Sequence, residues 1–179
     1  GASGLKKNSV DKLHPIVARG FLIDVAGAKG VANLEAGYEI TMADVRDALA
    51  KQGLADVRLL PGDGIFFRTG WGVHWIKDNA KFNSGEPGIG MEVAKWLSDT
   101  VQAGVVGSDT WGLENVPAKD PGCAFCVHAH MLTRHGIVNQ ENMDLDALAA
   151  DKAWRFLYLY SPAPIAGATG SMGAPVAVR

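Results

Sequence analysis

The chain has 179 residues, a length close to one ordinary domain and sufficient to bury a sizeable core. Apolar residues make up 47% of it and charged residues 20%, which is the balance of a soluble globular protein. The formal net charge is −2, and its 17 basic and 19 acidic residues are interspersed, so the sequence offers no basic track for nucleic acid or for an anionic membrane surface. A small neutral or anionic ligand remains compatible with this composition.

No apolar run approaches the roughly 18 residues that a membrane-spanning helix needs, and the polar start lacks the apolar core of a signal peptide. We therefore expect a cytoplasmic protein without a membrane partner. The first residue is Gly rather than Met, and residues 1–7 form a weakly structured lead-in. Such a start is typical of a tag remnant or of the middle of a longer chain, and composition does not choose between them.

The first predicted element is a strand, or a bent pair of strands, over residues 15–25, which is rich in β-branched and aromatic residues. Asp24 then lies near the end of a strand. A helix is predicted over residues 41–52, because Thr41 and Asp44 form a capping-box pattern before apolar residues on one face. The chain thus begins with a strand and a helix in succession.

The middle of the chain repeats this alternation. A short apolar strand over residues 65–70 runs into the segment 69–72, which we expect to be an exposed loop. A helix is predicted from Ser84 to about Thr100, and a buried strand over residues 104–107 follows it.

The remaining elements follow a loop-like stretch over residues 111–125. They are a helix over residues 128–135, a strand over 136–140, a small helix beginning at Asp144, a strand over 154–160 and a final strand over 175–178. Strands alternate with helices throughout, and no repeat or composition shift divides the chain. We therefore predict an α/β fold with residues 1–179 in a single domain.

Four potential metal ligands lie close together at Cys123, Cys126, His128 and His130. Structural zinc sites usually draw their ligands from two separated segments, so a site built from this run alone is disfavoured. The spacing of the cysteines also fits a dithiol redox pair, but no strand leads directly into it. Two free, reduced cysteines are the favoured interpretation for a cytosolic protein.

His128 and Glu141 form a second candidate pair. An imidazole and a carboxylate from different points of a strand-helix-strand unit can converge on a divalent metal. From these residues alone, a surface histidine and a helix cap are the more ordinary interpretation.

Three tryptophans, Trp71, Trp75 and Trp111, occupy loops that follow predicted strands. Loops of this kind form ligand pockets in open α/β sheets. Each tryptophan taken singly is more often a cover for the core.

Seven short segments occur in an informative order. They are Pro-Ile-Val-Ala-Arg-Gly-Phe-Leu-Ile-Asp-Val at 15–25, Arg-Thr-Gly-Trp at 68–71, Pro-Gly-Ile-Gly at 87–90, Gly-Ser-Asp-Thr at 107–110, Val-His at 127–128, Glu-Asn-Met-Asp-Leu at 141–145 and Gly-Ala-Thr-Gly-Ser at 167–171. In this order they closely resemble the cyclase family of metal-dependent hydrolases, which includes kynurenine formamidase-like and isatin hydrolase-like proteins. The resemblance covers nearly the whole chain.

The resemblance implies a swivelling β/β/α architecture with a mixed sheet, and hydrolysis of a small amide, lactam or ester by water that zinc or manganese activates. His128 matches the family's late histidine, which is a metal ligand in some members and supports proton transfer in others. Glu141 matches the late metal-binding carboxylate. Thr69, Trp71 and Trp111 are the expected substrate-binding residues, and a homodimer or larger assembly is implied.

The family's signature segment, His-x-Gly-Thr-His-x-Asp-x-Pro-x-His, does not occur in these 179 residues. A truncated chain, a natural half that needs a partner segment, and a remnant without catalysis would each account for this, and we favour the first. The leading hypothesis is a metal-dependent hydrolase with part of its metal site missing from this chain. The alternatives are a non-catalytic small-molecule-binding domain that keeps the aromatic pocket, and a dithiol or small zinc protein built on Cys123 and Cys126.

Overall fold

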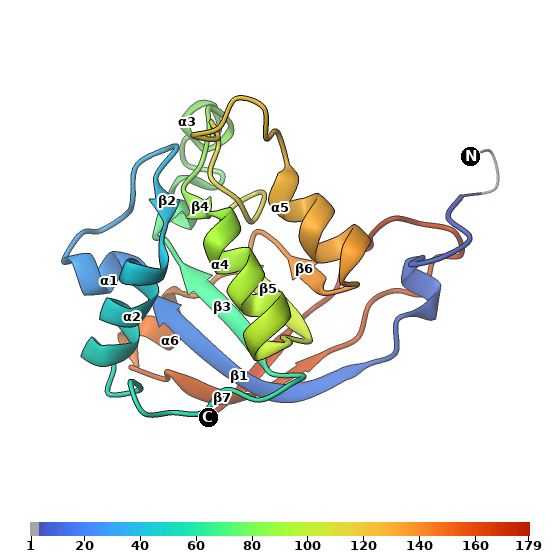
Figure 1. Ribbon diagram of the computed structural model, residues 1–179, viewed down its shortest axis with the longest axis horizontal. Helices are drawn as coiled ribbons and strands as arrows, with labels where there is room; N and C mark the ends of the chain where they lie inside the picture. The colour runs from blue at the N-terminus through green and yellow to red at the C-terminus, as the bar shows by residue number, and fades with distance from the viewer. Residues whose placement is uncertain (1–3) are drawn as a thin grey trace.

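A six-stranded mixed sheet forms the centre of the computed structural model, which describes residues 4–179 (Figure 1). Of the lead-in predicted over residues 1–7, positions 1–3 lie outside the described residues. In spatial order the strands are β6 (Val138–Gln140), β5 (Val105–Ser108), β3 (Gly64–Arg68), β1 (Ile16–Asp24), β7 (Arg155–Tyr160) and β8 (Val176–Val178). The four strands from β6 to β1 pair in parallel, whereas β7 and β8 extend the sheet in antiparallel pairing.

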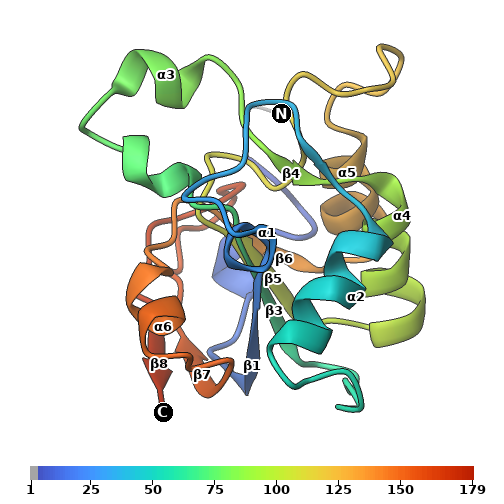
Figure 2. The same cartoon turned by 90° about the vertical axis from the view of Figure 1, so that its left-hand side faces the viewer.

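Most helices cover one face of this sheet, and α6 lies on the opposite side (Figure 2). The helices are η1 (Val10–Lys12), α1 (Val25–Lys29), α2 (Met42–Lys51), η2 (Trp71–His74), α3 (Asn79–Asn83), α4 (Met91–Lys95), η3 (Trp96–Val101), α5 (Cys126–His128), η4 (Ala129–Arg134) and α6 (Asp146–Ala150). Of these, η1 and η2 are 3-10 helices, whereas η3 and η4 are π-helical turns that continue α4 and α5. A small parallel pair, β2 (Glu39–Ile40) with β4 (Gly88–Ile89), accompanies the main sheet. Within residues 4–179, no helix is both long and apolar enough to cross a bilayer.

The central strands are buried on both faces, and successive side chains enter different cores. Phe21 and Ile23 of β1 pack into the larger core beneath the helices, whereas Leu22 packs into a smaller core with Phe66 and Tyr158. This division follows from the two-residue period of a strand, which sends neighbouring side chains to opposite faces. The fold class predicted from the sequence, α/β with a mixed sheet and flanking helices, is confirmed.

Two local predictions were wrong. The segment 69–72 is not an exposed loop: Thr69 and Trp71 are fully buried, because the carboxylate of Asp109 draws the loop inward by accepting the backbone N–H groups of Thr69 and Gly70. The helix predicted from Ser84 begins only at Met91. The residues before it are extended because they pair with a distant loop through Glu86 and Val116.

Candidate functional site

His128 lies between two carboxylates near the carboxyl ends of β5 and β6. Its Nδ1 is 2.6 Å from Oε1 of Glu114, and its Nε2 is 3.0 Å from Oε1 of Glu141. Glu141 directly follows β6, and Glu114 belongs to the loop that follows β5. Because these parallel strands are neighbours, their carboxyl ends bring both loops to one edge of the sheet, where ligand sites of α/β folds occur. The structure thus brings the two predicted metal-site residues together.

Glu114 holds both the ring and the helix of His128. Besides the Nδ1 contact, its carboxylate accepts the backbone N–H groups of Val127 at 3.1 Å and of His128 at 3.0 Å. A carboxylate at the start of a helix also interacts favourably with the helix dipole. Burial opposes ionisation of Glu114, but the hydrogen bonds from His128 and Val127 outweigh it and lower its pKa. Sequence reasoning missed Glu114, because a single glutamate 14 positions before His128 carries no local signal.

Glu86 contributes a third carboxylate to the same cluster. Its side chain is 0% exposed; Oε2 accepts the Gly112 N–H at 3.0 Å, whereas Oε1 has no hydrogen-bond partner within residues 4–179. Burial, together with repulsion from Glu141, raises its pKa to about 8 against the opposing hydrogen bond from Gly112. A Cβ atom at position 112 would lie 2.5 Å from this Oε1 and 3.5 Å from Cε1 of His128, so the absent side chain leaves room between the two residues.

His128 carries the positive charge of the cluster. Hydrogen bonds to Glu114 and then Glu141 raise its pKa to about 9, against the effect of burial. The imidazole is therefore protonated at neutral pH and forms ion pairs with both carboxylates.

The donor set fits a divalent metal ion. Nε2 of His128 and Oε1 of Glu141 are 3.0 Å apart, close to the separation of about 3.4 Å between two ligands of one tetrahedral ion. Glu114 on Nδ1 supplies the carboxylate contact that fixes the tautomer and orientation of a metal-binding imidazole. The unpaired, buried Oε1 of Glu86 is a further oxygen that a cation would satisfy. Imidazole with carboxylates suits zinc or manganese.

The three expected substrate-binding residues, Thr69, Trp71 and Trp111, differ in how deeply they are buried. Thr69 is buried and donates its hydroxyl to Oδ1 of Asp109 at 2.6 Å, and the Trp71 side chain is 1% exposed. The indole N–H groups of Trp71 and Trp111 both donate to the carbonyl oxygen of Phe82, at 3.3 and 3.1 Å. Thr69 and Trp71 are therefore buried residues whose hydrogen bonds hold neighbouring loops together. Trp111 is only partly buried.

A cavity of about 250 Å³ lies between the loop after β3 and the loop after β6. Trp75, which is 53% exposed, lines it together with Phe82 and Asn142, the residue that follows Glu141. Of the three loop tryptophans, Trp75 is thus the one that faces this cavity. Its place directly after the 3-10 turn η2 gives no sequence signal that separates it from Trp71.

The interpretation of Cys123 and Cys126 as free thiols was wrong, because their sulfur atoms are bonded to each other. Two residues lie between them, and the second, Phe125, adopts a left-handed backbone conformation with φ of 55°. This turn brings the two Cα atoms to 5.2 Å, within the usual range for a disulfide. Neither sulfur is therefore available as a thiolate ligand in this structure.

Comparison with solved proteins places this fold among cyclases. A protein described as a novel cyclase is 35% identical, with a TM-score of 0.77 over 90% of this chain and 53% of that one. Isatin hydrolase A from Ralstonia solanacearum is 22% identical, with a TM-score of 0.71 over 96% of this chain and 64% of that one. Isatin hydrolase A from Labrenzia aggregata, solved with benzyl benzoate, is 20% identical, with a TM-score of 0.66 over 97% of this chain and 66% of that one.

The present chain thus spans 53–66% of the length of these solved relatives. A search of curated proteins gave no match. The family model described as a putative cyclase matches residues 2–115, a range that contains Glu86 and Glu114 and ends before His128. The resemblance inferred from the sequence is confirmed by this match over more than half of the chain, and the chain belongs to the cyclase family.

Proposed function

We propose that this chain supplies part of a divalent-metal centre for the hydrolysis of a small amide, lactam or ester. The observation that carries the proposal is the position of His128 between Glu114 and Glu141, with Glu86 beside them. Zinc or manganese is the proposed ion, because both bind imidazole and carboxylate ligands. We further propose a homodimer or larger assembly, as the resemblance implies, and a cytoplasmic location, as expected from the sequence.

The residues of this chain have different roles in the proposed centre. Nε2 of His128 and Oε1 of Glu141 would hold the ion, and Glu114 keeps a proton on Nδ1 so that Nε2 presents its lone pair. A divalent ion supplies Lewis acidity, which activates water and polarises a carbonyl group. Glu86 can hold or release a proton at Oε1 near neutral pH, because its pKa is about 8.

The set of ligands in this chain is smaller than a catalytic centre requires. A catalytic zinc ion commonly takes three protein ligands and keeps one position for water or substrate. The His-rich signature segment of the family, absent from these 179 residues, would supply the others. We propose that such a segment, outside this sequence, completes the centre.

The cavity beside Asn142 supports a small substrate. Its volume of about 250 Å³ accommodates a compact organic molecule, and Trp75 and Phe82 offer aromatic surface for a planar ring. The isatin hydrolases among the structural relatives are named for a small bicyclic compound. A cyclic amide is accordingly the first substrate class to test.

The test compares metal content and hydrolysis of small cyclic and formylated amides between the unmodified protein and the variants His128→Ala and Glu141→Gln. We expect each variant to lose metal affinity or hydrolysis rate by at least ~10-fold, the scale seen when metal sites are disturbed. Glu92→Gln, an exposed substitution of the same kind on α4, is the matched control. Unchanged metal occupancy and rate in both site variants would refute the assignment.

A non-catalytic binding domain is the second candidate, and the exposed Trp75 in the cavity wall favours it. This function predicts that an aromatic ligand quenches Trp75 fluorescence equally before and after metal chelation, with no product formed. Trp75→Leu identifies the signal, since Trp71 and Trp111 lie outside this cavity wall. Hydrolysis that disappears on chelation would exclude the binding-only function.

A further inference from the structure

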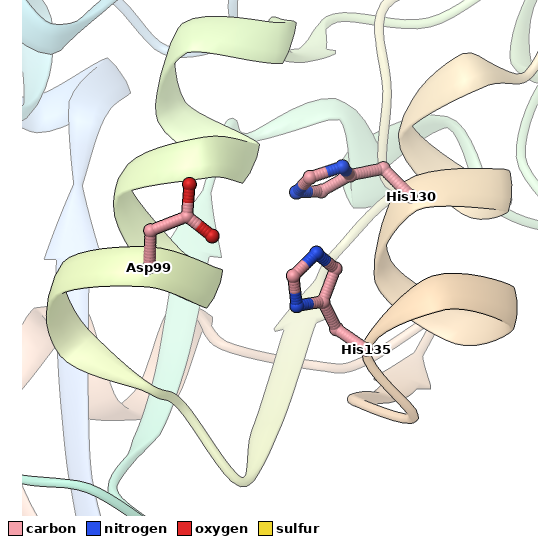
Figure 3. Close-up of side chains that lie close together, drawn as sticks. All are labelled: Asp99, His130 and His135. Carbon is pink, nitrogen blue, oxygen red and sulfur yellow. The ribbon is translucent and has the colours of Figure 1, made fainter.

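A second group of potential metal ligands lies between the two π-helical turns. Asp99 comes from η3, His130 from η4 and His135 from the residue that ends η4. One ligand atom from each of these three residues lies within 4.8 Å of the other two. Figure 3 shows the carboxylate and the two imidazole rings pointing into the same gap between the two helices.

The rings of His130 and His135 lie side by side although the two residues are five positions apart in the sequence. In an α-helix, residues three and four apart are neighbours on the surface. His130 lies within η4, whereas His135 is the residue directly after it, and its backbone N–H donates to the carbonyl oxygen of Leu132. The two imidazole ring centres are 4.4 Å apart. π-Helical turns are rare and occur frequently at functional sites, and here two of them contribute ligands to one cluster.

The cluster also has a supporting residue. The hydroxyl of Ser98 is 2.7 Å from Oδ1 of Asp99 and 2.8 Å from Nε2 of His130, so it joins the two ligands across the gap. His130 is 8% exposed, whereas Asp99 and His135 reach solvent. The hydrogen bonds of Ser98 therefore fix the orientation of the ligand side chains from the protein interior, and the two exposed ligands leave the group accessible to an ion from solvent.

This cluster is separate from the one around His128. Residues two positions apart on a helix do not face each other, and accordingly His128 contacts Glu114 and Glu141 whereas His130 contacts Ser98.

We propose that Asp99, His130 and His135 form a second divalent-metal site, which takes zinc or a similar borderline ion and links η3 to η4. Two imidazoles and one carboxylate are a common donor set for zinc, with water in the fourth position. Cobalt and nickel prefer the same nitrogen and oxygen ligands and can serve as probes. Since η4 continues α5, which carries His128, an ion at this site would also link α5 to η3.

The experiment uses zinc titration by calorimetry in a His128→Ala, Glu141→Gln background, so that the first centre does not contribute. We expect this protein to bind one zinc ion and, above the dissociation constant, to gain thermal stability with the logarithm of the free zinc concentration. His135→Gln and Asp99→Asn are expected to weaken binding by at least ~10-fold, whereas His14→Gln, at an exposed histidine remote in sequence, leaves it unchanged. Because His135 and Asp99 are exposed, these substitutions leave the core intact.

A second measurement avoids substitution at the new site. Cobalt added to the same background protein is expected to broaden the imidazole NMR signals of His130 and His135 before that of His14. No zinc binding in this background, binding that neither substitution weakens, or equal broadening of all three histidines would overturn the proposal. The proposed hydrolase function does not depend on this result, because its own test follows His128 and Glu141.

Discussion

Replacing Glu114 with glutamine tests how this chain holds His128. The carboxylate accepts three N–H groups, two on Oε1 from His128 and one on Oε2 from Val127. Glutamine keeps one acceptor oxygen and turns the other into a donor, so the buried Val127 N–H loses its partner. That loss costs about 1–3 kcal/mol, and the lost charge on the His128 bond adds about 1 kcal/mol, so we expect about 3 kcal/mol in the free energy of unfolding.

The cost of this substitution depends on pH in a defined direction. The pKa of His128 is raised from 6.5 to about 9, so the ion pair stabilises the fold fully below pH 6.5 and this contribution is lost as the pH rises through 9. Urea unfolding of the metal-free protein should therefore show a larger cost of Glu114→Gln at pH 6.5 than at pH 10. Glu92→Gln, which is exposed on α4, is the control at both values. A cost below about 1 kcal/mol at pH 6.5, or an equal cost at both values, would refute the reasoning.

Two further substitutions test the surroundings of the site. Gly112→Ala places a Cβ atom 2.5 Å from Oε1 of Glu86, so that carboxylate must move; we expect metal affinity measured by calorimetry to fall at least ~10-fold, with Gly170→Ala, where nothing lies within 4 Å, as the unaffected control. Asp109→Asn turns one of the two oxygens that accept the Thr69 hydroxyl and two backbone N–H groups into an amide donor, and should lower the free energy of unfolding by about 2–4 kcal/mol in urea. A loss below about 1 kcal/mol would contradict the role of Asp109 in holding this loop.

Local patterns in the sequence predicted most of the fold, because strands and helix caps depend largely on interactions between residues that are close in the sequence. The strand over residues 15–25 and the Thr41 and Asp44 capping box need only neighbouring residues, and β1 and α2 appear where expected. The helix predicted from Ser84 failed for the opposite reason. The backbone of Glu86 exchanges hydrogen bonds with that of Val116, and no pattern near residue 84 reveals a partner so far along the chain.

The site divides in the same way. His128 and Glu141 came from an ordered set of motifs, which preserves information about distant parts of a fold. Glu86 and Glu114 are single glutamates in irregular segments, and only the folded arrangement gives them a role. Trp71 and Trp75 have the same sequence pattern around them. Hydrogen bonds from Thr69 and Gly70 to Asp109 hold the segment just before Trp71 inward, so Trp71 is buried, whereas Trp75 lies at the cavity.

Charge balance explains why this cluster is suited to a cation. Three carboxylates, from Glu86, Glu114 and Glu141, surround one imidazole, and the negative groups outnumber the positive one. The two raised pKa values point the same way: His128 keeps its proton to about pH 9, and Glu86 keeps one to about pH 8. Both protons offset negative charge that burial makes costly. A divalent ion would offset the same charge, and it would bind the lone pair of Nε2 that the proton now occupies. The cluster therefore favours a metal ion over an anionic ligand. A carboxylate group of a substrate or product would be attracted by the bound ion, not by these side chains.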